Sequence, residues 1–180
     1  MDVRFQIQRS GPALHPSWTK VLVLSALILC GTIASPGVSA QILEIRASGG
    51  EQSIRSDLTH KTQTFPEVEW SIFNQIESDG IAVIWTADAF TGDPQTRQQQ
   101  VDVGLDLRMT RDGRRNAWSV TRPHDTTHLA GGDSTAEVIA VSARAADGTA
   151  AITVRFEGGD PIRLAAGSYS TVVVGTIAPL

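Results

Sequence analysis

The chain has 180 residues, with 15 Lys or Arg against 19 Asp or Glu and a formal net charge of -4. From residue 41 onward there are 12 basic and 18 acidic residues, so we expect neither nucleic acid nor an anionic membrane surface as a partner. Cys30 is the single cysteine, so no disulfide can form within the chain and the hydrophobic core must hold the fold together.

The first forty residues follow the pattern of a cleaved secretory signal. A polar start with three basic residues precedes the apolar run Val21 to Ala34, and Val38-Ser39-Ala40 supplies the short side chains that precede a cut. The apolar run is shorter than the roughly 17 to 25 residues of a membrane-spanning helix, although an uncleaved anchor remains the alternative. We predict a signal peptide at 1–40, cleavage after Ala40, and a mature chain outside the membrane that is secreted, periplasmic or at the cell surface.

Residues 41–180 alternate between apolar and polar side chains with a period of two. Val101 to Met109 shows the alternation clearly, and Gly, Pro, Asp and Asn gather between such segments, as expected of strands and turns. The predicted strands are 41–47, 68–76, 81–85, 101–109, 117–121, 136–143, 150–156 and 168–178.

Turns and loops divide these strands. Asp112-Gly113 predicts a hairpin turn, and Asp147-Gly148 predicts a further turn. The segments 48–66 and 87–100 are polar, and we predict long loops there. The resulting prediction is one all-β domain at 41–180, an immunoglobulin-like β-sandwich of about seven to nine mainly antiparallel strands, preceded by the signal peptide.

The aromatic residues of the predicted strands are candidates for the core. Trp70, Trp85 and Trp118 each lie within an alternating segment, and large aromatic side chains dominate the burial of strand residues. The alternative is an exposed aromatic face that binds carbohydrate. Tyr169 follows Gly167 at the start of the last strand, and we expect its ring to be buried and its hydroxyl to bond to the backbone.

A metal site or a catalytic site has little support. His124 and His128 stand four apart, as in zinc-binding helices, but Pro123 and Gly131-Gly132 flank them and favour a loop. No hydrolase motif or phosphate-binding loop is present, and the carboxylate pairs of the strands fall on one face, which we interpret as solvated. We therefore expect no metal, no cofactor and no enzymatic activity.

Two C-terminal segments resemble a known group of proteins. Asn116 to Thr121, with Trp118 and Val120, and Ala165 to Ile177, with Gly167 and Tyr169, resemble bacterial pilin-like surface proteins such as the spore-coat-U and related fimbrial-subunit families. The resemblance implies an immunoglobulin-like fold and a structural or adhesive role on the cell surface. The chain departs from the pattern in lacking a disulfide and in carrying the polar segment 48–66.

The same resemblance implies assembly by strand donation, in which one subunit completes the sheet of its neighbour. The candidate donor has Leu43, Ile45 and Ala47 on one side and is followed by the flexible Ser48-Gly49-Gly50. The alternative is a strand paired within its own sandwich. We thus predict a non-catalytic surface or fimbrial-type component whose partners are itself or other surface subunits; the alternative function is a secreted carbohydrate-binding module.

Overall fold

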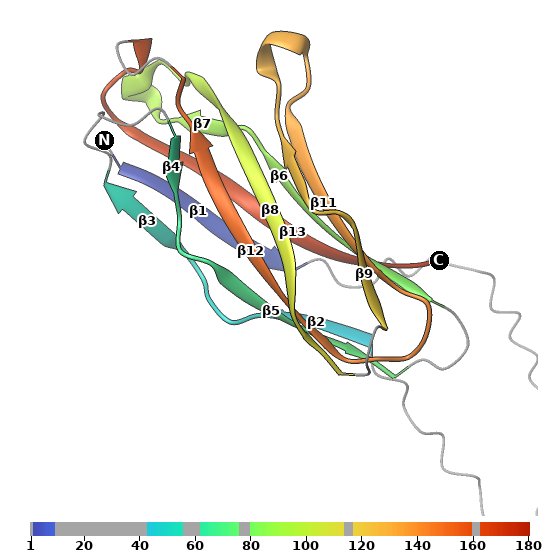
Figure 1. Ribbon diagram of the computed structural model, residues 1–180. Coiled ribbons are helices and arrows are strands. Elements are labelled where there is room, and N and C mark those ends of the chain that lie inside the picture. Colours follow the sequence, from blue (N-terminus) through green and yellow to red (C-terminus); the bar gives the residue numbers. More distant parts are fainter. Residues whose placement is uncertain (1, 10–42, 56–61, 76–79, 114–116, 160–162) are drawn as a thin grey trace, which may run out of the picture.

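The computed structural model describes residues 2–9, 43–55, 62–75, 80–113, 117–159 and 163–180, and these contain thirteen strands and two short 3-10 helices (Figure 1). The strands are β1 (Asp2–Arg9), β2 (Leu43–Ala47), β3 (Gln52–Arg55), β4 (Thr62–Thr64), β5 (Val68–Asn74), β6 (Ile81–Asp88), β7 (Phe90–Gly92), β8 (Gln100–Asp112), β9 (Trp118–Arg122), β10 (His124–Thr126), β11 (Thr135–Ser142), β12 (Gly148–Glu157) and β13 (Ser168–Pro179). The helices are η1 (Pro94–Thr96) and η2 (Leu129–Gly131). The predicted all-β class is confirmed.

The strands form two layers that are packed face to face. The first sheet has the order β3-β1-β13-β6-β11-β9, and the second has the order β2-β5-β12-β8-β10, with β4 also on β12. The short strand β7 pairs with β13 and with β8, so it joins the two sheets at one end of the sandwich. In Figure 1 the second sheet lies in front of the first.

Alternation explains which side of each strand faces the core. In β11 every second residue is buried, from Ala136 to Ser142, and β8 and β13 behave in the same way. Trp70 and Trp85 are fully buried from opposite sheets, with their rings 6.2 Å apart and nearly perpendicular. Burial of such large rings supplies much of the hydrophobic stabilisation of a sandwich.

The connections differ from those that the turn residues predict. Asp112-Gly113 does not close a hairpin, because β8 lies in the second sheet and β9 pairs with β11 in the first. The Asp147-Gly148 segment likewise leads from one sheet to the other. Among the described strands, β7 and β8 are the one consecutive pair that is hydrogen-bonded.

The number of strands exceeds the predicted seven to nine because several short strands lie where we predicted other structure. The segment 48–66, predicted as a loop, contains β3 and β4, and the segment 87–100 contains β7 and η1. Asp2–Arg9, predicted as part of the signal peptide, forms β1. In the described part of the chain no helix has the length and apolar character needed to span a membrane.

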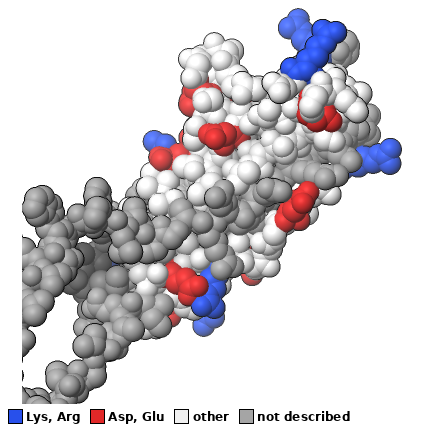
Figure 2. Space-filling view, turned by 180° about the vertical axis from the view of Figure 1, so that it is seen from behind, with Lys and Arg blue, Asp and Glu red and all other residues white. Residues whose placement is uncertain are grey.

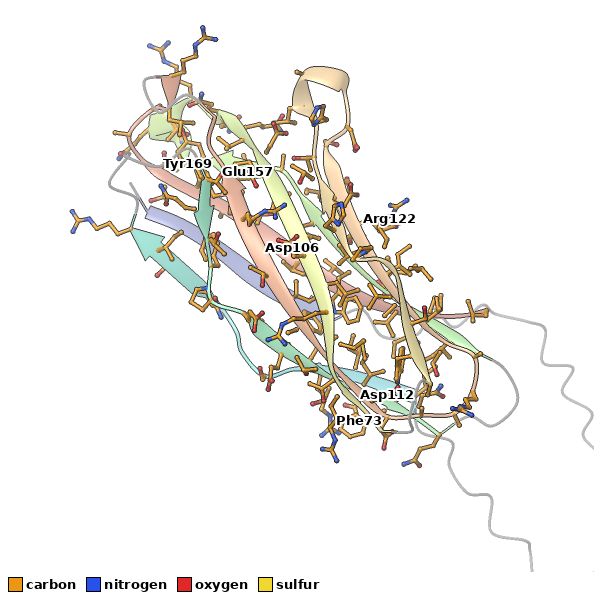
Figure 3. The ribbon with its side chains drawn as sticks, in the orientation of Figure 1. Phe73, Asp106, Asp112, Arg122, Glu157 and Tyr169 are labelled. Carbon is orange, nitrogen blue, oxygen red and sulfur yellow. The ribbon has the colours of Figure 1, made fainter. Side chains whose placement is uncertain are left out.

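An aromatic cluster fills the end of the sandwich opposite to Phe73 and Asp112, where Figure 3 shows Tyr169. The ring of Tyr169 lies 5.6 Å from that of Phe156, and Phe156 in turn lies 5.1 Å from Phe90. The Tyr169 hydroxyl is within hydrogen-bond distance of Gln99 Oε1, at 2.8 Å, and of the Ala165 carbonyl, at 3.1 Å. The residue is fully buried, as its position predicts.

The ring and the hydroxyl group of Tyr169 should contribute unequally to the free energy of unfolding. We expect Tyr169→Ala to lower the free energy of unfolding by about 3–5 kcal/mol, as for other buried aromatic side chains. Tyr169→Phe should cost about 1 kcal/mol, because it removes a hydrogen bond and keeps the ring. Urea titrations followed by circular dichroism measure both values, and an unchanged midpoint in Tyr169→Ala would contradict the buried position.

Candidate strand-binding site at β13

β13 is a long strand that would be unprotected if one of its edges were free. Its twelve residues include no charged side chain, and its proline is the last residue of the strand. On one edge it pairs with β6 and β7, and on the other it pairs with β1. Natural proteins cover or charge such an edge, because its free amide and carbonyl groups otherwise pair with another chain.

The terminal strands of the two sheets do carry such protection. β2 contains Glu44 and Arg46, β9 is short and ends at Arg122, and β3 is shorter still and ends at Arg55. Charged side chains and short length both limit pairing with other chains. β13 has neither feature, so its second edge depends on the strand that covers it.

β1 covers this edge in a parallel arrangement. Eight residue pairs are in register, from Asp2 with Ser168 to Arg9 with Gly175. The pairing of β1 with β13 is parallel, whereas β1 with β3 and β13 with β6 are antiparallel. β3 then pairs with the far side of β1 through four residue pairs. β1 is therefore an inner strand of the first sheet, held from both sides.

The sequence of β1 suits its register. The apolar residues Val3, Phe5 and Ile7 are paired with Tyr169, Thr171 and Val173, whose side chains are buried. The alternate polar residues of β1 are paired with positions such as Ser170, which is exposed. Because paired residues occupy the same face of a sheet, the apolar positions of β1 share their register with buried positions of β13.

Two side chains fix the backbone at the start of β13. The Asp93 carboxylate accepts hydrogen bonds from the amides of Ser168, at 3.1 Å, and Thr96, at 3.0 Å. The Gln99 side chain accepts from the Ala165 amide at 3.0 Å and donates to the Arg163 carbonyl at 3.1 Å. The loop before β13 is thus held to the β7–β8 connection, and the edge has a defined beginning.

The same contacts act on two titratable groups. The hydrogen bonds from the amides of Ser168 and Thr96 lower the pKa of Asp93 below its usual value, because they stabilise the ionised form. Burial raises the pKa of Tyr169, because removal from water disfavours the phenolate. Near neutral pH, Asp93 is therefore ionised and Tyr169 is neutral.

The candidate donor strand lies within its own sandwich. Leu43, Ile45 and Ala47 belong to β2, which pairs with β5 through five residue pairs, and Ile45 is buried. A methyl group on Gly175 would lie 2.7 Å from the ring of Trp70, so β5 and β13 approach closely beside Ile45. The structure places β2 in the position that the intramolecular alternative describes.

The remaining candidate residues do not form a site. His124 and His128 are both exposed, and the described residues include no group of three or more His, Cys, Asp or Glu that could hold a metal ion. Trp118 is 8% exposed and donates a hydrogen bond to the Asp147 carbonyl. With Trp70 and Trp85 in the core, these three tryptophans provide no exposed aromatic face.

The outer faces of both sheets carry ion pairs, and in the first sheet Arg122 of β9 lies 2.9 Å from Glu137 of β11. The outer face of the second sheet carries ion pairs, among them Arg108 with Glu67 at 2.5 Å and Arg155 with Asp106 at 2.7 Å. Figure 3 shows Asp106 and Glu157 on this side. Figure 2, which views the molecule from behind, shows charged side chains separated by uncharged surface. On β13, Val172 and Val174 alternate with the buried residues and are partly exposed.

The comparisons with known proteins assign no family. The chain matches no model of a known protein family, and no curated protein is similar to it in sequence. The geometry of β13 and its neighbours is therefore the basis for the function that we propose below.

Asp93 makes the stability of the loop before β13 dependent on pH. Its pKa is lowered in the folded state, so its ionised form stabilises the fold above the unfolded pKa of about 3.9. This contribution is lost as the pH falls through the folded pKa. We expect Asp93→Asn to be less stable than the wild type at neutral pH and to approach it in acid; urea titrations at several pH values measure the difference, and a deficit independent of pH would contradict the prediction.

Proposed function

We propose that the chain is an exported, non-catalytic surface subunit that accepts an extended strand from another subunit at the edge of β13. The observation that carries the proposal is the position beside β13, which is filled by Asp2–Arg9, a segment outside the predicted mature domain. If the signal peptide is removed after Ala40, this strand leaves with it. The position between β13 and β3 is then vacant.

Removal of β1 breaks backbone pairing in the first sheet alone. β3 loses its described partner, and β13 loses the neighbour of eight of its residues. The second sheet and the pairs of β13 with β6 and β7 do not involve β1. The mature domain therefore keeps most of its pairing and exposes one uncharged edge, which is the requirement for a strand-accepting subunit.

The register also describes the strand that fits. Its apolar residues occupy three alternate positions opposite Tyr169, Thr171 and Val173, and its polar residues occupy the positions between them. Main-chain hydrogen bonds supply affinity in this kind of recognition, and the alternate side chains supply selectivity. A strand of this kind from another copy or from another surface protein meets both conditions.

The carbohydrate-binding alternative has less support. A carbohydrate-binding face of this kind requires exposed tryptophan rings, but Trp70, Trp85 and Trp118 are buried. Hollows of about 470 and 390 Å³ adjoin β13 and are lined partly by hydroxyl groups, but they contain no exposed aromatic ring among the described residues. Strand acceptance accounts for a larger part of the observed geometry.

A peptide with the sequence of Asp2–Arg9 tests the proposal on purified residues 41–180. We expect the labelled peptide to bind, because it restores the partner of β13, and binding is measured by fluorescence anisotropy. The same peptide with Phe5→Asp should bind at least about 10-fold more weakly, because a carboxylate opposite buried Thr171 loses its hydration.

Light scattering coupled to size-exclusion chromatography gives a second readout. Residues 41–180 should form oligomers that increase with concentration, and added peptide should reduce them. A matched chain that retains Asp2–Arg9, with Gly and Ser in place of residues 10–42, should remain monomeric. A folded domain that neither binds the peptide nor associates would overturn the proposal.

A further inference from the structure

The strand that fills the edge of β13 belongs to the same chain and precedes the predicted cut. β1 lies before the apolar run at 21–34, and β2 begins after Ala40. Cleavage after Ala40 would therefore separate β1 from β13 covalently. The removed segment would then have two parts: the apolar run that directs export and a strand that completes the sheet.

The match between β1 and its position extends from Asp2 to Gln8, whereas Arg9 is paired with the buried Gly175. Each of its eight residues has a partner on β13, and its apolar alternation agrees with the buried positions of that strand. The agreement goes beyond the basic composition that a signal peptide needs at its start. Arg4 and Arg9 provide the positive charge, whereas Val3, Phe5 and Ile7 have no part in that requirement.

The covalent connection gives β1 an advantage over any other strand. A strand tethered in the same chain competes at an effective concentration that is on the order of millimolar for a flexible connection. A separate strand at micromolar concentration is then a weak competitor. After cleavage the advantage disappears, because the released segment is diluted to the concentration of the protein.

We propose that Asp2–Arg9 is a built-in occupant of the β13 edge, which blocks strand acceptance in the uncut chain and is permanently lost on cleavage after Ala40. The inference rests on the proposed function, since it describes how that same edge is regulated. β1 and β13 can pair only while both lie on the same side of the membrane, so the block operates on the precursor before export. It prevents subunits from joining in the compartment where they are made.

The test compares the full chain before and after cutting. A protease site placed directly after Ala40 allows the purified chain to be cut in solution, and the probe is the labelled Asp2–Arg9 peptide. We expect the peptide to bind the uncut chain about 100-fold more weakly than residues 41–180, the ratio of a millimolar effective concentration to an affinity of about 10 μM. Binding should return after cutting and removal of the released segment.

Two substitutions in the uncut chain separate occupation of the edge from other effects. Phe5→Asp, opposite buried Thr171, should release β1 and let the peptide bind without cutting. Gln6→Asp adds the same charge at the next position, opposite the partly exposed Val172, and should keep the edge closed. A second version of each chain, with the apolar run at 21–34 replaced by Gly and Ser, keeps the comparison valid if the natural run causes aggregation.

The outcomes distinguish this inference from the function on which it rests. If residues 41–180 bind no peptide, the proposed function fails. If residues 41–180 bind and the uncut chain binds equally well, the proposed function stands and the built-in block is overturned. Equal behaviour of Phe5→Asp and Gln6→Asp would also overturn the block, because the register assigns them to opposite faces of the sheet.

Discussion

A long strand without charged side chains requires a neighbour on each edge, and the first sheet is organised around this requirement. β13 pairs with β6 and β7 on one edge and with β1 on the other. Burial of Tyr169, Thr171 and Val173 sets the face of the strand, and contacts from Asp93 and Gln99 set where it begins. Removal of β1 from this arrangement leaves a domain with a specific, unsatisfied edge. The proposed function follows from that edge.

The periodicity of the sequence predicted most of the strands, because alternation is a local property that one buried face imposes. Val101 to Met109 lies within β8, and 168–178 lies within β13. The partners of the strands were not predictable in the same way. Asp112-Gly113 has the residues of a hairpin turn, yet the chain crosses there to the other sheet. Which strand pairs with which depends on packing of the whole core, and turn residues do not encode it.

The candidate site was only partly visible in the sequence. Burial of Tyr169 follows from its place at the start of an alternating strand. β1 was missed because the basic residues and the apolar run that follows them predict a signal peptide, and this interpretation drew attention away from Val3, Phe5 and Ile7. Their alternation was a usable signal. Its parallel partner, β13, lies at the far end of the sequence, and no local pattern relates the two.

The connections between the sheets also affect how fast the molecule can fold. Since one consecutive pair of described strands is hydrogen-bonded, most pairing joins segments that are distant in the sequence. Domains dominated by such contacts fold in milliseconds to seconds, far more slowly than helical bundles. Slow folding prolongs the time for which unpaired strands are exposed, and such strands can pair with other chains. The crossing topology thus makes the incompletely folded chain the form in which association with other copies competes with folding.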